Sequence, residues 1–190
     1  MGKAQSKLSH EQLQELQKST YFDRKELQQW YKDFLKDCPS GHMTKAEYQR
    51  IFKQFFPFGD PSGFAEYVFN AFDTSSNGTI DFKDFICALS VTARGSIEEK
   101  IKWSFQLYDQ DHDGRVSYTE MVAVVDAIYR MVGSMMKLPA DEATAEKRVA
   151  KIFAAAGKDR RDALSPAEFG AVSQQDPTVV SALTIYDGLV

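Results

Sequence analysis

One stretch decides the fold that we expect for this chain: Asp109-Gln110-Asp111-His112-Asp113-Gly114-Arg115-Val116-Ser117-Tyr118-Thr119-Glu120. It places oxygen-bearing side chains at positions 1, 3, 5, 9 and 12 of a twelve-residue loop. Ca²⁺ takes six to eight oxygen ligands at about 2.3–2.6 Å and accepts both oxygens of one carboxylate. The sequence therefore predicts a calcium site with these ligands: the side chains of Asp109, Asp111 and Asp113, the backbone carbonyl of Arg115, Ser117 directly or through water, and both carboxylate oxygens of Glu120.

This spacing is the signature of an EF-hand, in which a calcium loop joins two helices. Gly114 at position 6 permits the sharp turn, because a positive φ there would strain a residue that has a Cβ. An acidic, solvated turn would explain the charges of the stretch but not their spacing. We therefore interpret the stretch as a metal loop.

A second loop of the same length runs from Asp73 to Asp84. Its expected ligands are Asp73, Ser75, Asn77, the Thr79 carbonyl, Asp81 and Asp84. Asp84 stands at position 12, where Glu is usual, and its side chain is one methylene shorter. A shorter arm must tighten the loop or coordinate through one oxygen, which leaves a smaller site that Mg²⁺ can also occupy. We expect this site to be weaker or less selective for Ca²⁺ than the loop at Asp109.

A third stretch, from Lys36 to Glu47, has the outline of such a loop without its ligands. Lys36 stands at position 1, where an Asp is needed. Cys38 stands at position 3, where its sulfur is a poor ligand for Ca²⁺, and the following Pro39 fixes the backbone. We predict an inactive hand that keeps the fold without the metal.

A fourth stretch, from Gly157 to Glu168, also lacks ligands. Gly157 occupies position 1, the cation Arg161 occupies position 5, and Asp162 replaces the glycine of position 6. We expect no Ca²⁺ in this loop.

The position-12 residues Glu47, Asp84, Glu120 and Glu168 follow one another at intervals of 37, 36 and 48 residues, so the chain is a fourfold repeat with one insertion. Each loop has an apolar residue at position 8, which predicts that loops pair through a short two-stranded β contact. The expected fold is all-α: four EF-hands in two paired lobes, residues 1–95 and 96–190. The insertion, residues 133–147, is interpreted as a linker between the third and fourth hands.

Asp176-Pro177 predicts a last helix over residues 178–186, with apolar residues over much of its surface. Such a segment could belong to the core or could be a removable plug over an apolar groove. The sequence leaves both interpretations open.

Composition is typical of a globular intracellular chain. Of its 190 residues, 43% are hydrophobic, including fourteen Phe, which is ample for a core, and the two cysteines are too few for a disulfide framework. No stretch has the length and apolarity of a transmembrane span. Two Ca²⁺ ions would offset the net charge of −4, so a nucleic-acid partner is not indicated.

The first residues, Met1-Gly2-Lys3-Ala4-Gln5-Ser6, fit the pattern for N-myristoylation at Gly2. A single myristoyl chain gives only marginal, reversible membrane binding, so a second signal is required. Lys3 and Lys7 are candidates for contacts with anionic lipid.

Several segments together resemble the neuronal calcium sensor family and, within it, the frequenin group: Met-Gly at the start, the Cys38-Pro39 loop, Lys53-Gln54-Phe55-Phe56-Pro57-Phe58-Gly59, Tyr129-Arg130-Met131-Val132-Gly133 and Tyr186-Asp187-Gly188-Leu189-Val190. The resemblance spans nearly the whole chain. It implies a myristoylated, cytoplasmic Ca²⁺ sensor at the Golgi or plasma membrane, with an inactive first hand. It also implies a hydrophobic groove that engages targets such as phosphatidylinositol 4-kinase. The fourth hand departs from the family pattern, because frequenins use it for Ca²⁺.

The expected groove would accept an amphipathic target helix. The family resemblance places these candidate groove residues on one face: Trp30, Phe34, Tyr48, Ile51, Phe52, Phe55, Phe85, Leu89 and Trp103. The alternative for any one of them is a simple core position.

The sequence bears on three classes of function. A sensor that opens an apolar groove on binding Ca²⁺ is favoured over a Ca²⁺ buffer without a dedicated target, because a buffer needs neither the anchor signal nor the surplus aromatics. An enzyme is not expected, because His10, His42 and His112 are isolated and no phosphate loop or catalytic triad pattern is present.

Overall fold

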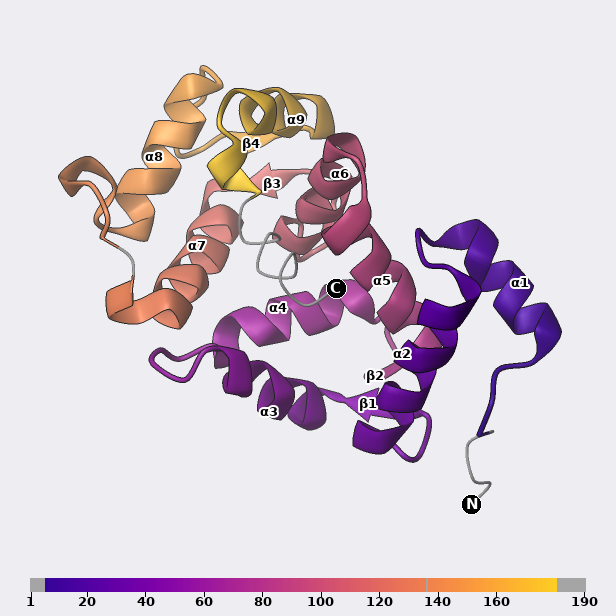
Figure 1. The fold of residues 1–190 in the computed structure, drawn as a ribbon. Helices are drawn as coiled ribbons and strands as arrows, with labels where there is room; N and C mark the ends of the chain where they lie inside the picture. Colours follow the sequence, from indigo (N-terminus) through magenta and orange to yellow (C-terminus); the bar gives the residue numbers. More distant parts are fainter. Residues whose placement is uncertain (1–5, 136, 181–190) are drawn as a thin grey trace.

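Helices joined by short loops make up most of the chain (Figure 1). The computed structural model describes residues 6–135 and 137–180, apart from the side chains of Phe55 and Ser134. The first half contains α1 (His10–Ser19), α2 (Arg24–Asp37), β1 (His42–Thr44), α3 (Lys45–Phe55), α4 (Ser62–Phe72), β2 (Thr79–Asp81) and α5 (Phe82–Arg94). The second half contains α6 (Ile97–Tyr108), β3 (Val116–Ser117), α7 (Tyr118–Val132), α8 (Ala145–Ala155), β4 (Ala163–Leu164) and α9 (Pro166–Gln175), with the 3-10 turns η1 (Gly133–Met135), η2 (Ala140–Glu142) and η3 (Pro177–Val179).

The loops pair through two short antiparallel contacts, as predicted. Strand β1 pairs with β2 so that Met43 lies opposite Ile80, and β3 pairs with β4 so that Val116 lies opposite Leu164. These four residues occupy position 8 of their loops, and all four are buried. The mostly helical fold of paired EF-hands is therefore confirmed.

Several helices begin at the capping boxes that the sequence contains. Ser9 accepts a hydrogen bond from the Gln12 N–H at the start of α1, and Asp23 accepts one from the Glu26 N–H at the start of α2. Ser96 does the same for α6. In each case the third helical residue bonds back to the cap, which satisfies two backbone N–H groups that would otherwise lack partners.

The two halves of the chain are in contact. Helix α4 packs against both α6 and α7, and the Phe72 ring meets the Trp103 ring edge-on with centroids 5.6 Å apart. Helix α5 ends at Arg94 and α6 begins at Ile97, which is where the sequence places the lobe boundary. The division into lobes at residues 1–95 and 96–190 stays a prediction.

Two segments differ from expectation. The linker proposed for residues 133–147 is partly ordered, because it contains η1 and η2 and α8 already begins at Ala145, where the Thr144 side chain accepts from the Lys147 N–H. Where a helix is expected over residues 178–186, the described part shows the 3-10 turn η3, capped by Asp176, and residues 181–186 lie outside the described part. Within the described residues, none of the helices has the length and apolarity needed to cross a membrane.

Candidate metal centre

The Asp109–Glu120 loop lies between α6 and α7. Asp109 ends α6 as its C-cap, and the residue is buried, with 6% of its surface exposed. It accepts hydrogen bonds from the backbone N–H groups of Asp113 at 3.2 Å and Gly114 at 3.0 Å. The loop backbone therefore wraps around the position-1 carboxylate, with Gly114 in the left-handed region at φ 83°.

Glu120 reaches back across the loop from the first turn of α7. Its Oε1 accepts from the Gln110 N–H at 3.0 Å and the Asp111 N–H at 3.3 Å, while its Oε2 accepts from the Ser117 N–H at 2.8 Å. As a result, oxygen atoms of Asp109, Asp111 and Glu120 all lie within 4.8 Å of one another. Three carboxylates at this separation form a donor set of the hard oxygen type that Ca²⁺ prefers.

The electrostatics of this loop favour a cation. Burial raises the pKa of the Asp109 carboxyl, and the nearby charges of Glu120 and Asp113 raise it further, against the lowering effect of the backbone hydrogen bonds. Carboxylates that repel one another in a partly desolvated site are stabilised by a bound positive ion. The residues present therefore fit a calcium ion.

The remaining predicted ligands of this loop line the same turn. The Asp113 carboxylate accepts from the Arg115 N–H at 2.8 Å, and the Ser117 hydroxyl donates to Glu120 at 2.8 Å. The Arg115 guanidinium points to the neighbouring hand, where it donates to the Ala163 carbonyl at 3.1 Å. Because a guanidinium is always positively charged and has no acceptor atom, only the backbone carbonyl of Arg115 could bind the metal, and its coordination stays a prediction.

The Asp73–Asp84 loop repeats this backbone arrangement with a weaker convergence of acids. Asp73 is the buried C-cap of α4 and accepts from the Asn77 N–H at 3.2 Å and the Gly78 N–H at 2.7 Å. Asp84 instead accepts from the Thr74 hydroxyl at 2.6 Å. Among the described residues, no three acidic side chains of this loop converge as those of the Asp109 loop do.

The other predicted ligands of this second loop are engaged within it. The Asn77 carbonyl oxygen accepts from the Thr79 N–H at 2.9 Å, and the Ser75 hydroxyl donates to Asp73 at 3.2 Å. Asp81 caps α5 by accepting from the Asp84 N–H at 2.8 Å. The ligand types fit a hard cation, and the weaker affinity of this loop stays a prediction.

The Lys36–Glu47 loop has no comparable donors. The Cys38 side chain is fully buried, and burial raises the pKa of its thiol to about 11. The thiol is therefore protonated at neutral pH and unsuited to hold a metal. Glu47 serves as the capping partner of α3, accepting from the Thr44 N–H at 2.8 Å.

The Gly157–Glu168 loop carries its own cation. Gly157 follows the end of α8 with φ 67°, and the Lys158 N–H bonds to the Phe153 carbonyl, so position 1 is part of a helix-ending motif and not a ligand. The Lys158 ammonium lies 2.9 Å from the Glu168 carboxylate. A backbone hydrogen bond from Ser165, together with Lys158, lowers the pKa of Glu168 to about 2.

The cation that pairs with position 12 is one that the sequence analysis did not single out. Arg161 at position 5 is 92% exposed in its side chain and lies 3.6 Å from Asp159. Lys158 at position 2 is the residue that pairs with the position-12 carboxylate. The loop spacing does not reveal this, because a lysine side chain is long enough to reach position 12 from several loop positions.

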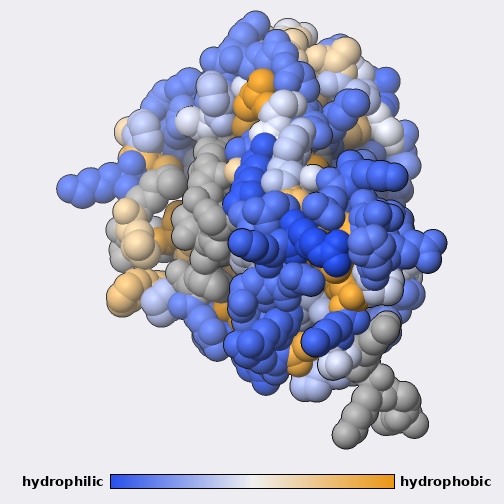
Figure 2. Space-filling model, turned by 45° about the vertical axis from the view of Figure 1, so that its right-hand side comes forward, coloured by the Kyte–Doolittle hydropathy of each residue, from blue (hydrophilic) through white to orange (hydrophobic). Residues whose placement is uncertain are grey.

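The predicted groove residues lie in or against the core. Trp30 contacts Phe85, Phe85 contacts Phe34 and Phe72, and Phe72 contacts both Tyr48 and Trp103. Five of the nine residues are buried in the core cluster: Phe34, Tyr48, Phe52, Leu89 and Trp103. Trp30, Ile51 and Phe85 are partly buried, and the side chain of Phe55 lies outside the described part. Figure 2 shows one face of the molecule, which is largely hydrophilic with scattered apolar residues. A groove over these residues stays a prediction.

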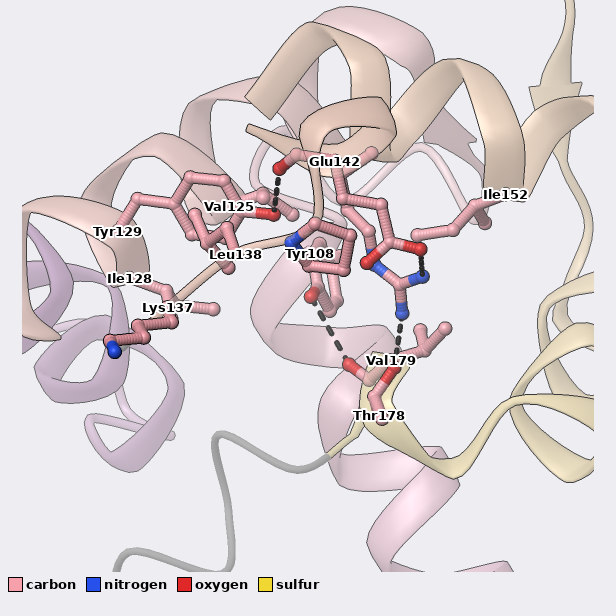
Figure 3. A pocket seen from close by; sticks show the side chains of 12 residues that line it. Tyr108, Val125, Ile128, Tyr129, Lys137, Leu138, Glu142, Ile152, Thr178 and Val179 are labelled. Carbon is pink, nitrogen blue, oxygen red and sulfur yellow. Dashed lines mark hydrogen bonds and ion pairs between the residues drawn. The ribbon is translucent and has the colours of Figure 1, made fainter. Parts of the chain in front are cut away.

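A pocket of about 240 Å³, which the sequence did not indicate, lies in the second half between α7, α8 and the insertion (Figure 3). Its apolar wall is contributed mainly by Tyr108, Val125, Ile128, Leu138, Ile152 and Val179. The buried Arg148 guanidinium is neutralised there by Glu142 at 3.3 Å and Asp176 at 2.8 Å. Tyr108 donates to the Val179 carbonyl at 3.2 Å, which ties the C-terminal turn to α6.

The fold and the metal centre define an EF-hand calcium-binding protein. The family models described as "EF-hand domain" and "EF hand" match residues 64–95 and 101–125, which contain the Asp73 and Asp109 loops. The chain is 51% identical to neuronal calcium sensor 1 of Lymnaea stagnalis and to that of Aplysia californica, over 98% of both chains in each case. It is 44% identical to human recoverin, over 89% of this chain and 86% of recoverin. The chain therefore belongs to the neuronal calcium sensor family.

Proposed function

We propose that this protein is a Ca²⁺ sensor that binds one ion in the Asp109–Glu120 loop and a second, weaker ion in the Asp73–Asp84 loop. Mg²⁺ also fits the second loop, because its position-12 arm is short. The observation that carries the proposal is the convergence of oxygen atoms of Asp109, Asp111 and Glu120 within 4.8 Å. The names of the relatives agree with a sensor.

Ion binding acts directly on helix orientation. Glu120 lies in the first turn of α7 and Asp84 in the first turn of α5, so a pull on either carboxylate is transmitted to an exiting helix. Both helices carry buried apolar residues, including Val124 and Val125 on α7 and Ile86 and Leu89 on α5. A change in either helix angle would expose such a stripe.

The target is an amphipathic helix that docks on the exposed apolar surface, and phosphatidylinositol 4-kinase is the candidate that family resemblance supplies. Trp30 and Phe85 are suited to this contact because they are only partly buried and touch each other with ring centroids 6.2 Å apart. Burial of aromatic surface contributes about 25 cal/mol per Å², part of which the ordering of the two partners offsets.

Membrane attachment in this proposal uses a myristoyl group on Gly2, which lies outside the described residues, at the cytoplasmic face of the Golgi or plasma membrane. Lys7 is exposed, where its ammonium group can meet anionic lipid. Because one acyl chain binds only marginally, this attachment is reversible.

An apolar dye and a target fragment test the proposal. We expect Ca²⁺ to increase the fluorescence of an apolar dye bound to the protein and to promote binding of an amphipathic helix from phosphatidylinositol 4-kinase, compared with chelator. The matched control is Glu120→Gln, which removes the charged ligand of the stronger loop and should suppress both responses. Tight Ca²⁺ binding with no change in either readout would identify a Ca²⁺ buffer instead.

A further inference from the structure

A short segment from the first half of the chain caps a helix of the second half. The backbone N–H of Asp60, between α3 and α4, donates to the Arg130 carbonyl at 2.9 Å. Arg130 lies in the last turn of α7, where carbonyl groups have no partner within the helix. The other half of the chain thus supplies the partner of one end carbonyl of α7, while the Gly133 N–H of the same half bonds to the Tyr129 carbonyl.

The two backbones meet there with no space between them. A Cβ added to Gly59 would lie 2.7 Å from the Arg130 carbonyl oxygen and closer still to that of Met131, and both are backbone atoms that cannot rotate away. Near the start of α4, Gly63 faces Ala127 of α7, and a Cβ added to Gly63 would make an ordinary contact with the Ala127 Cβ at 3.6 Å. We call this contact, formed by Gly59, Asp60, Gly63, Ala127 and Arg130, the glycine seam.

The seam joins two helices that each carry a metal loop at their far end. Helix α4 starts at Ser62, which donates through its hydroxyl to Asp60 at 2.6 Å, and it ends at the position-1 ligand Asp73. Helix α7 starts beside the position-12 ligand Glu120 and ends at the seam. The two helices also pack side by side (Figure 1).

We propose that the glycine seam couples the two calcium sites: an ion in the Asp109–Glu120 loop fixes α7, and α7 sets the position of α4 and thereby of the Asp73–Asp84 loop. The inference rests on the proposed binding of an ion in each loop. A displaced helix moves the helices that pack against it, because protein interiors are close-packed and not continuously deformable. Coupling of this kind is reciprocal, so an ion in either loop strengthens binding in the other by the same factor.

The test measures the Ca²⁺ affinity of the Asp73–Asp84 loop with and without a functional Asp109–Glu120 loop. The amide resonances of Gly78 and Gly114 follow the two loops separately during a Ca²⁺ titration by ¹⁵N NMR. In the otherwise wild-type protein, Glu120→Gln should weaken binding in the Asp73–Asp84 loop about fivefold or more, which is the lower range of typical coupling. In a Gly59→Ala background, Glu120→Gln should weaken Ca²⁺ binding in the Asp73–Asp84 loop less than about twofold.

The matched control is Gly63→Ala, whose added methyl group fits, and it should leave the coupling as in wild type. Circular dichroism and thermal unfolding establish that each variant is folded. If Gly59→Ala does not fold, Ala127→Leu, which places bulk between α7 and α4, is measured in its place with the same expected loss of coupling.

The outcomes separate the inference from the proposed function. Equal coupling in Gly59→Ala and wild type, or the absence of coupling in wild type with both loops filled, would overturn the seam proposal alone. Failure of either glycine amide to respond to Ca²⁺ in wild type would overturn the proposed function of that loop, and the seam proposal with it.

Discussion

The fourth hand (Gly157–Glu168 loop), which we predict to bind no Ca²⁺, is expected to support calcium binding by the Asp109–Glu120 loop, and Leu164→Ala measures that support. Leu164 has no exposed surface and lies directly opposite Val116, position 8 of the calcium loop. Removing a buried leucine side chain costs about 2–5 kcal/mol, because transfer free energy is lost and a cavity remains. We expect the free energy of unfolding of the metal-free protein to fall by this amount in urea denaturation.

Calcium affinity gives the second readout of the same substitution. The β3–β4 contact holds the loop that contains Arg115 and Ser117, so we expect the Asp109–Glu120 loop to bind Ca²⁺ about tenfold more weakly in Leu164→Ala, a change of about 1.4 kcal/mol. The control is Met43→Ala, which removes the equivalent buried side chain opposite Ile80. It should lower the Ca²⁺ affinity of the Asp73–Asp84 loop by a larger factor than that of the Asp109–Glu120 loop. A loss of stability with unchanged Ca²⁺ affinity in both loops would refute this supporting role of the first and fourth hands.

Three further predictions concern the weaker loop, the target surface and pH. Asp84→Glu should raise the preference of the second loop for Ca²⁺ over Mg²⁺, because the longer arm offers both oxygens; unchanged affinities for both ions in calorimetry would disprove the arm-length reasoning. Trp30→Ala and Phe85→Ala should weaken binding of the target helix much more than binding of Ca²⁺, and affinities equal to wild type at saturating Ca²⁺ would place the target surface elsewhere. The Arg94 guanidinium lowers the pKa of Glu26, so the stability from this pair is present above the ordinary Glu pKa and is lost as pH falls through the lowered value; Glu26→Gln should flatten this part of the acid unfolding curve, and an unaltered curve would contradict it.

Much of the fold follows from local patterns. The capping box Ser96 to Glu99 involves residues only three positions apart, so the sequence alone predicts where α6 begins. The apolar residue at position 8 of each loop likewise predicts that Val116 lies opposite Leu164. The carboxylates of Asp109, Asp111 and Glu120 are equally predictable, because their spacing is set by the chemistry of one ion.

Other features depend on contacts between distant segments. Aromatic residues such as Trp103 fit a core and a groove equally well, and only the packing against Phe72 shows that this side chain is buried. The pairing of Lys158 with Glu168 depends on the path of the loop backbone after the end of α8, which the spacing of residues alone does not give. The glycine seam has no sequence signal, because Gly59 and Arg130 meet only in the folded chain.

The number of bound ions tests the central claim most directly. Isothermal titration calorimetry of the full-length protein with Ca²⁺ should find two ions, with dissociation constants of roughly 10⁻⁷ to 10⁻⁵ M if the sites are of the sensor type. Glu120→Gln should remove the tighter one. A third ion, abolished by a substitution in the Gly157–Glu168 loop, would contradict the account, as would an Asp109–Glu120 loop that binds none.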